Sequence, residues 1–268
     1  MKTIWLVVPC YNEEEVLPET SKQLKNVMSS MIENGKISPE SKIAFVNDGS
    51  KDNTWNIIST LCTGDGIFAG INLSRNKGHQ NALLAGLMTA KKYADAVISL
   101  DADLQDDVNA IEKMVDNFIA GDDIVYGVRS SRKKDTFFKR FTAEGFYKFM
   151  AAMGVEIVFN HADYRLMSRR ALDALSEFDE VNLFLRGIVP QIGFKTSTVE
   201  YERKERLAGE SKYPLKKMLS FAFEGITSFS VRPLKIATTL GIFSLLVCLA
   251  MLIYCIVSKA TGRAVAGW

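Results

Sequence analysis

Two aspartates separated by one residue follow a short apolar run. Asp101 and Asp103 flank Ala102 in the segment D-A-D-L-Q-D-D. Their carboxylates can approach one divalent cation, and hard oxygen ligands select Mg²⁺ or Mn²⁺, which shares the phosphate oxygens of a substrate. A metal held in this way neutralises a diphosphate leaving group. Because strand ends commonly carry solvated aspartates, the pair alone also fits an ordinary surface loop.

The overall charge and the absent motifs argue against several classes of protein. The 268-residue chain carries 33 Lys and Arg against 31 Asp and Glu, a net charge of +2. This near balance argues against a nucleic-acid binder, which needs a basic excess to attract phosphates. The sequence has no G-x-x-x-x-G-K-[ST] loop and no G-x-G-x-x-G after its first apolar run, which disfavours a P-loop ATPase and a Rossmann dehydrogenase.

Short apolar runs alternate with segments of helical periodicity over the first hundred residues. The predicted strands are Thr3–Val8, Lys42–Asn47, Ile67–Leu73 and Ala96–Leu100, and the predicted helices are Glu13–Glu33, Asp52–Leu61 and Gly78–Tyr93. Repeated strand–helix–strand units predict an α/β fold with a mostly parallel sheet. Polar clusters at 9–13, 47–50 and 101–103 follow three of these strands, and ligands of parallel sheets bind at the carboxyl ends. We therefore expect the functional site at that edge.

A long uncharged stretch lies near the end of the chain. It runs from Ile236 to Ser258 between Lys235 and Lys259. At about 1.5 Å per residue a helix of this length reaches roughly 35 Å, enough to cross a bilayer core of about 30 Å. A buried core helix is the alternative, but the length and the flanking lysines favour a transmembrane helix. The N-terminal apolar run is too short for a signal peptide, so we expect residues 1–235 in the cytoplasm.

Two stretches before this helix interleave aromatic and basic residues, at 133–153 and 212–235. A helix with Phe on one face and Lys or Arg on the other lies at the membrane interface and is attracted to anionic lipid. For 133–153 a core helix of the soluble domain is the alternative. The predicted organisation is a cytoplasmic catalytic domain at 1–211 that includes this interfacial helix, a juxtamembrane amphipathic segment at 212–235, a transmembrane helix at 236–258, and a tail at 259–268 as a candidate truncation before a second span.

Several motifs together identify a family. They are V-P-C-Y-N-E-E at 8–14, V-N-D-G-S-K-D-N-T at 46–54, R-N-K-G at 75–78 and D-A-D-L-Q-D at 101–106, followed by G-V-R at 127–129, D-Y-R-L at 163–166, F-L-R-G at 184–187 and R-L-A-G-E-S-K-Y at 206–213. This set resembles glycosyltransferase family 2. With the membrane span, the whole chain is similar to the polyprenyl-phosphate glycosyltransferases, such as dolichyl-phosphate mannose synthase and the bactoprenol glucosyltransferases. The latter usually carry two spans, and this sequence shows one.

The resemblance implies a GT-A fold, a Rossmann-like sheet flanked by helices, with a nucleotide-sugar site. The physics agrees, because Tyr11 can stack on a base and Asp48 can accept a hydrogen bond from a base N–H. The implied metal ligands for Mg²⁺ or Mn²⁺ are Asp101 and Asp103. The implied nucleotide-sugar-binding residues are Pro9, Tyr11, Glu13, Asp48, Asp101 and Gln105.

Asp163 matches the aspartate that the family is proposed to use as catalytic base, and Asp103 is the second catalytic candidate. Alternatively, Asp163 orients the metal or an arginine such as Arg165. His161, two residues before Asp163, is expected to be an ordinary loop histidine.

The expected acceptor is an anion. A lipid phosphate carries about −1.5 to −2 charges at neutral pH and is already a nucleophile. The enzyme therefore needs cations that hold and orient it more than it needs a strong base. The candidate lipid-phosphate-binding residues are Arg129, Arg140, Arg206, Ser211 and Lys212, for each of which a plain surface role is the alternative.

The predicted function is inverting transfer of one sugar to polyprenyl phosphate on the cytoplasmic membrane face. The first expectation is glucose from UDP-glucose and undecaprenyl phosphate as acceptor; UDP-N-acetylglucosamine and GDP-mannose follow as donors. A processive polysaccharide synthase is disfavoured because its Q-x-x-R-W motif is absent. A catalytically silent membrane scaffold that binds nucleotide sugar or lipid is the alternative from another class. A homo-oligomer stays open, and a flippase and a downstream glycosyltransferase are expected from pathway logic alone.

Overall fold

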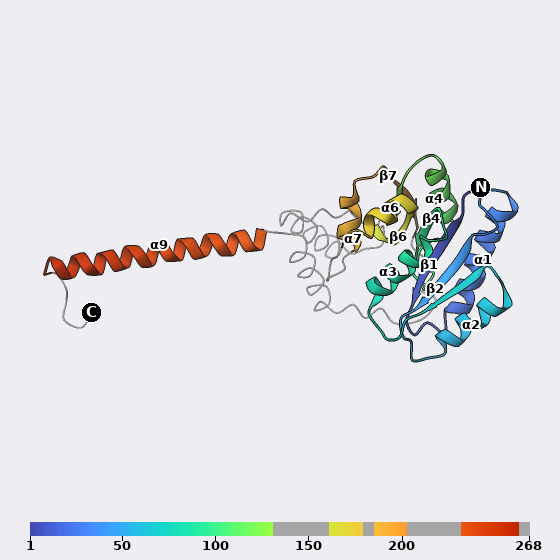
Figure 1. Cartoon of the computed structure of the whole chain (residues 1–268), viewed down its shortest axis with the longest axis horizontal. Helices are drawn as coiled ribbons and strands as arrows, with labels where there is room; N and C mark the ends of the chain where they lie inside the picture. The colour runs from blue at the N-terminus through green and yellow to red at the C-terminus, as the bar shows by residue number, and fades with distance from the viewer. Residues whose placement is uncertain (131–160, 179–184, 203–231, 263–268) are drawn as a thin grey trace.

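The computed structural model describes residues 1–130, 161–178, 185–202 and 232–262, which form an α/β body and one separate long helix (Figure 1). In the body, seven strands form one sheet in the order β3-β2-β1-β4-β6-β5-β7. The strands are β1 (Ile4–Cys10), β2 (Lys42–Asn47), β3 (Phe68–Asn72), β4 (Ala96–Ser99), β5 (Ile124–Arg129), β6 (His161–Ser168) and β7 (Thr196–Tyr201). The helices are α1 (Leu17–Glu33), α2 (Thr54–Gly64), α3 (His79–Ala90), α4 (Ala110–Ile119), α6 (Arg169–Leu175), α7 (Leu185–Ile188), a 3₁₀ turn at Val189–Ile192, and α9 (Arg232–Ala260).

The first four strands pair in parallel, as expected for strands that are joined by crossover helices. β6 breaks this pattern, because it lies between β4 and β5 and runs antiparallel to both. β7 then pairs in parallel with β5 at the edge of the sheet. The sheet is thus mostly parallel, as predicted. The antiparallel strand brings the start of β6 to the carboxyl end of β4, where the D-A-D segment follows.

Side chains that alternate along the central strands divide the core into two layers. Leu6 and Phe45 belong to the layer that packs against α1, α2 and α4. Val7 and Ala44, each one residue away, belong to the layer that packs against α3, α6 and α7. Both faces of these strands are buried, which explains why they are continuous apolar runs in the sequence. The sheet, with helices packed on both of its faces, fixes the strand ends relative to one another.

Most predicted boundaries agree with the structure to within about three residues. The predicted start of the first helix at Glu13 was wrong, because α1 begins at Leu17. The backbone N–H of Glu13 donates instead to the hydroxyl of Thr54, and that of Glu14 donates to the carboxylate of Asp52. Contacts with a distant loop therefore hold this segment out of the helix. The sequence pattern shows only the apolar spacing, and not this competing tertiary interaction.

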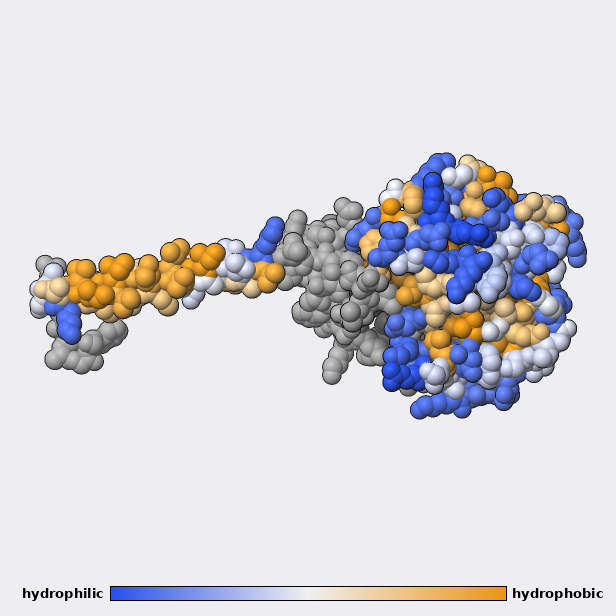
Figure 2. Space-filling view, in the orientation of Figure 1, coloured by the Kyte–Doolittle hydropathy of each residue, from blue (hydrophilic) through white to orange (hydrophobic). Residues whose placement is uncertain are grey.

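Helix α9 carries the uncharged stretch. The most apolar 18-residue window within its segment Leu234–Ala260 has a mean hydropathy of 2.8, and none of that window is buried against the rest of the protein. Figure 2 shows its surface as a nearly continuous hydrophobic band, in contrast to the mixed surface of the body. Exposing a large apolar side chain to water costs about 1.5–3 kcal/mol, so a helix with this surface requires lipid or an apolar partner. By length and composition α9 is a candidate membrane span.

Some predictions fall on residues outside the described ranges. They are the interfacial helix at 133–153, most of the juxtamembrane segment at 212–235, and the end of the tail after residue 262. The proposed domain limits therefore remain predictions.

A close backbone contact joins two of the motifs. Gly49, in the loop after β2, has a φ of +65°, and a Cβ at this position would lie 2.6 Å from the backbone N of Asn76. The backbone atoms of Arg75 are at nearly the same distance. Only glycine allows the loop after β2 to pack directly on the R-N-K-G segment.

We predict that Gly49→Ala lowers the midpoint of thermal unfolding more than Gly35→Ala does. Gly35 has a similar φ of +67°, but a Cβ at this position would have no atom within 4 Å. Its substitution therefore costs only the backbone strain of the left-handed conformation, about 1–2 kcal/mol. Gly49→Ala adds a clash with backbone that must move. The measurement is thermal denaturation of the full chain in detergent, and equal shifts for the two variants would contradict the contact.

Candidate active site

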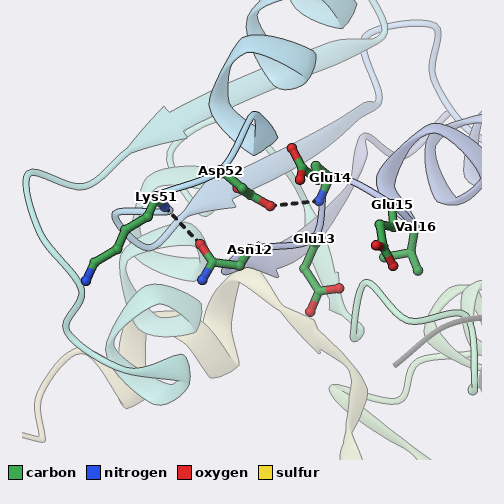
Figure 3. Close-up of a pocket in the computed structure, with 7 residues that line it drawn as sticks. All are labelled: Asn12, Glu13, Glu14, Glu15, Val16, Lys51 and Asp52. Atoms are coloured by element: carbon green, nitrogen blue, oxygen red, sulfur yellow. Dashed lines mark hydrogen bonds between the residues drawn. The ribbon is translucent and has the colours of Figure 1, made fainter. Parts of the chain in front are cut away.

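The loops that follow β1 and β2 are joined by hydrogen bonds. Asn12 accepts from the backbone N–H of Lys51 at 2.8 Å, and the Asn12 backbone N–H donates to the Ser50 hydroxyl at 3.0 Å. Asp52 accepts from the backbone of Glu14, as Figure 3 shows together with the Asn12 contact. These bonds hold both loops at the carboxyl edge of the sheet.

Pro9, Tyr11 and Glu13 lie along this loop in three different environments. Pro9 is buried in β1, where it pairs with Val46, and it therefore fixes the point at which the loop leaves the sheet. Tyr11 is 41% exposed, so its ring is accessible to a ligand. Glu13 is half-buried and helps to line a pocket of about 440 Å³ (Figure 3). The remaining lining residues are Asn12, Glu14, Glu15, Val16, Lys51 and Asp52.

Asp48 holds the R-N-K-G segment. Its two carboxylate oxygens accept hydrogen bonds from the backbone N–H groups of Lys77 and Gly78, at 2.7 and 2.9 Å. The residue is only 2% exposed. In the structure Asp48 thus fixes the turn that starts α3 at His79, and its predicted contact with a nucleotide base remains a prediction.

The D-A-D-L-Q loop after β4 is constrained at several points. The Thr20 hydroxyl in α1 donates to the carbonyl of Ala102 at 2.6 Å. Asp103 accepts from the backbone N–H of Gln105 at 3.2 Å, and Leu104 adopts a φ of +54°, which costs a non-glycine residue about 1–2 kcal/mol. Asp101, Asp103 and Gln105 all stay partly exposed, whereas Ala102 and Leu104 between them are buried. The alternation presents the polar side chains together toward solvent.

Asp101 lies close to several other carboxylates. Its side chain is 37% exposed, yet burial of the carboxylate, followed by the charges of Asp163, Asp106 and Asp103, raises its pKa to about 6, and His79 opposes this shift. A divalent cation would relieve the repulsion, and carboxylate oxygens are suitable ligands for a hard ion. Asp101 and Asp103 therefore fit the predicted metal. Within the described ranges, no three His, Cys, Asp or Glu side chains form a complete metal site by themselves.

Asp163 is the centre of a buried polar cluster. One carboxylate oxygen accepts from Arg165 at 2.7 Å and from Nε of Arg186 at 3.3 Å. The other accepts from Arg186 at 3.1 Å and from the Gln80 amide at 3.2 Å. Although burial alone would raise it, the nearby His79 and the charges of Arg186 and Arg165 hold the pKa of Asp163 well below its ordinary range. The carboxylate therefore stays ionised at physiological pH.

His79 connects this cluster to the D-A-D loop. Its Nε2 atom lies 3.5 Å from a carboxylate oxygen of Asp101 and 3.6 Å from one of Asp163. His79 is the first residue of α3. The side-chain amide oxygen of the adjacent Gln80 accepts a hydrogen bond from the backbone N–H of Leu185. The first two side chains of α3 thereby contact the loop after β4, the first part of β6 and the start of α7.

Sequence reasoning missed His79, Gln80 and Arg186 as site residues. His79 and Gln80 directly follow the R-N-K-G motif, and Arg186 lies within F-L-R-G. Their proximity to recognised motifs was the available signal. The expectation that His161 is a loop histidine was wrong, because it is the first residue of β6.

Among the predicted acceptor residues, Arg129 is the one within the described ranges. It ends β5, and its Nε donates to the Tyr201 hydroxyl at 3.4 Å. The other candidates, Arg140, Arg206, Ser211 and Lys212, lie outside those ranges.

Comparison with known proteins agrees with this geometry. Residues 5–176 match the model of glycosyl transferase family 2. The chain belongs to glycosyltransferase family 2. It is 54% identical over 98% of its length to the uncharacterized glycosyltransferase YkoT of Bacillus subtilis, of which it covers 78%. It is 42% identical over 90% of its length to the bactoprenol glucosyl transferase of Shigella phage SfV, of which it covers 76%.

Solved structures support the GT-A fold of this glycosyltransferase. The described architecture is similar to mannosyl-3-phosphoglycerate synthase from Rubrobacter xylanophilus, with a TM-score of 0.52, 12% identity, and coverage of 86% of this chain and 74% of that one. Glucosyl-3-phosphoglycerate synthase from Mycobacterium tuberculosis, solved with Mn²⁺, UDP and phosphoglyceric acid, has a TM-score of 0.51 at 15% identity, covering 85% and 77% of the two chains. At these identities the likeness concerns the fold.

We predict that Asp163→Asn lowers the free energy of unfolding by about 3–5 kcal/mol, because it leaves the fully buried Arg165 without its counter-charge. Asp173→Asn is the control, since it removes the carboxylate of a surface ion pair with Lys91 that is worth at most about 1 kcal/mol. Denaturant titration of both variants in detergent measures the difference. A loss for Asp163→Asn no larger than that of the control would show that the cluster is not held by this charge.

Proposed function

We propose that this glycosyltransferase transfers one sugar from a nucleotide diphosphate sugar to polyprenyl phosphate on the cytoplasmic face of the membrane. The observation that carries the proposal is the cluster in which His79 lies between Asp101 and Asp163, with Arg186 bound to Asp163. Because the single Asp163 carboxylate pairs with both Arg165 and Arg186, it does not neutralise both guanidinium groups. Asp101, a carboxylate suited to a cation, thus lies beside positive charge that can attract a phosphate. Donor and acceptor of this reaction require that pair of environments.

The relatives and α9 support the lipid acceptor. Bactoprenol glucosyl transferases from Shigella phages are 42% identical to this chain over most of its length. A polyprenyl chain stays in the bilayer, and α9 has the length and composition to anchor the enzyme beside it. Among the donors we place UDP-glucose first, and we propose undecaprenyl phosphate as the acceptor. UDP-N-acetylglucosamine and GDP-mannose are the alternatives.

On the donor side, we assign nucleotide-sugar binding to Pro9, Tyr11, Glu13, Asp48, Asp101 and Gln105, with Asp101 and Asp103 as the metal ligands. Bound Mg²⁺ or Mn²⁺ supplies positive charge that stabilises the departing diphosphate. The backbone constraints on the D-A-D-L-Q loop hold Asp101 and Asp103 in place before substrate binds. Preorganised groups of this kind stabilise developing charge without rearranging during the reaction.

For Asp163 we propose a positioning role rather than that of a proton acceptor. A phosphate acceptor is already ionised and has no proton that must be removed. Asp163 keeps its negative charge through contacts with two arginines and thereby fixes the Arg186 guanidinium at the site. The acceptor then attacks the anomeric carbon in one displacement, which inverts the configuration. Arg129, Arg140, Arg206, Ser211 and Lys212 are the proposed ligands of its phosphate.

The proposed reaction can be tested by mass spectrometry of the lipid product. We expect the purified full chain, supplied with undecaprenyl phosphate, Mg²⁺ or Mn²⁺ and UDP-glucose, to form a glycolipid, and chelation of the metal to stop its formation. UDP-galactose, UDP-N-acetylglucosamine and GDP-mannose in parallel reactions identify the donor. No product from any donor, with nucleotide-sugar binding intact, would favour the alternative of a catalytically silent membrane scaffold.

We predict that Asp103→Asn reduces turnover at least about a hundredfold while the protein stays folded, because a neutral amide is a weaker ligand for a hard cation. Asp116→Asn is the control, because it removes the same kind of carboxylate from α4, where Asp116 forms an ion pair with Lys36. The measurements are the rate of glycolipid formation and the thermal unfolding midpoint. Turnover of Asp103→Asn within a few-fold of the control would reject the metal assignment.

A further inference from the structure

Tyr201 lies outside all the recognised motifs, yet it contacts the active-site loop. It is the last residue of the edge strand β7 and is 4% exposed. Its hydroxyl donates to a carboxylate oxygen of Asp106 at 2.6 Å. Burial and the adjacent Asp106 raise the pKa of Tyr201, so the hydroxyl keeps its proton and remains a donor.

Asp106 is a buried carboxylate that is stabilised by Tyr201 and Arg129. It is 6% exposed, and an ionised group at such a position is costly unless it is hydrogen-bonded and faces positive charge. Tyr201 provides the hydrogen bond, and a guanidinium nitrogen of Arg129 lies 3.7 Å from the same oxygen. Arg129 also donates to the Tyr201 hydroxyl at 3.4 Å. The three side chains therefore form a closed triangle.

The backbone fixes this triangle. Arg129 and Tyr201 are paired residues at the ends of the parallel strands β5 and β7. The backbone N–H of Ser130 donates to the carbonyl of Tyr201 at 2.9 Å, which extends the pairing by one residue. Both rings of the neighbouring pair also support the loop, because Tyr164 packs edge-on against Tyr201 and its hydroxyl donates to the carbonyl of Asp107 at 3.0 Å.

We propose that Tyr201 is a positioning residue that, through Asp106, holds the Arg129 guanidinium in place for the phosphate of the acceptor. This inference rests on the proposed function, in which Arg129 binds that phosphate. Asp106 belongs to the same loop as the metal-binding aspartates. Tyr201 thus joins the donor side of the reaction centre to the acceptor side.

The physical reason lies in competition for the Asp106 carboxylate. While the Tyr201 hydroxyl occupies it at 2.6 Å, Arg129 stays at the longer distance of 3.7 Å. Without the hydroxyl, the carboxylate loses this hydrogen bond, and the Arg129 guanidinium moves closer to the same oxygen, which tightens their ion pair. An arginine neutralised in this way is a weaker ligand for a phosphate. Loss of the hydroxyl should therefore weaken acceptor binding more than donor binding.

Tyr201→Phe tests the inference, because it removes one oxygen and keeps the ring that packs on Tyr164. We expect the acceptor KM of the full chain to rise roughly tenfold or more, the usual effect of losing a hydrogen bond to a charged group, with the donor KM changed less than about threefold. In an Arg129→Gln background the same substitution should add less than about twofold, since interacting residues are not additive. Undecaprenyl phosphate is the acceptor, together with the donor identified in the transfer assay.

Tyr164→Phe is the matched control. It removes a hydroxyl from the partner ring and from the same loop, but that hydroxyl donates to the carbonyl of Asp107 and not to Asp106, so its effect should be the same in both backgrounds. An unchanged acceptor KM for Tyr201→Phe, or a full additional effect in the Arg129→Gln background, would overturn the inference while leaving the transferase proposal intact. If Arg129→Gln by itself leaves the acceptor KM unchanged, the assignment of Arg129 to the acceptor fails, and the inference fails with it.

Discussion

A carboxylate that is removed from water stays ionised only where positive charge surrounds it, and the arrangement around Asp163 meets this requirement. The fully buried Arg165 lies on the same strand, Arg186 comes from α7, and Gln80 comes from α3. Strand β6, helix α7 and the distant helix α3 therefore have to converge for this one charge to be tolerated. Their convergence brings the D-A-D loop, the start of α3 and α7 together at one end of the sheet.

The insertion of β6 makes that convergence possible. A purely parallel sheet would direct the start of every strand away from the carboxyl edge. Because β6 runs antiparallel between β4 and β5, its first residues lie beside the last residues of β4. Asp163 consequently reaches the edge at which the loops of β1, β2 and β4 also end. The loops proposed to bind the donor lie at the carboxyl ends of the parallel strands, where ligands of such sheets generally bind. The antiparallel strand β6 adds the cluster of Asp163 at the same edge.

The loops at this edge are held rigid by contacts that cost some local strain. Asn12 and Leu104 adopt positive φ values, and Gly49 packs its backbone directly on Arg75 and Asn76. Two hydrogen bonds compensate by fixing the same segments: the Asp52 carboxylate accepts from the backbone N–H of Glu14, and the Thr20 hydroxyl donates to the carbonyl of Ala102. Such preorganisation suits a transferase, since its site must hold a charged donor and a charged acceptor in one geometry. Under the proposed function, helix α9, with its apolar surface exposed along its length, keeps that site near the lipid substrate.

Much of this protein could be predicted from sequence, because some information is local. Apolar runs and helical spacing predicted the first four strands and their helices, the uncharged stretch predicted α9, and motifs predicted the family. The spacing of Asp101 and Asp103 made them candidates for a metal site, and the accompanying motifs were needed to favour that interpretation. The start of α1, the links made by His79 and the support from Tyr201 were not, because each depends on partners many residues away. The sequence by itself determined which side chains are present at the strand ends, whereas the tertiary structure decided which of them meet, since burial and charge compensation act only between groups that the fold brings together.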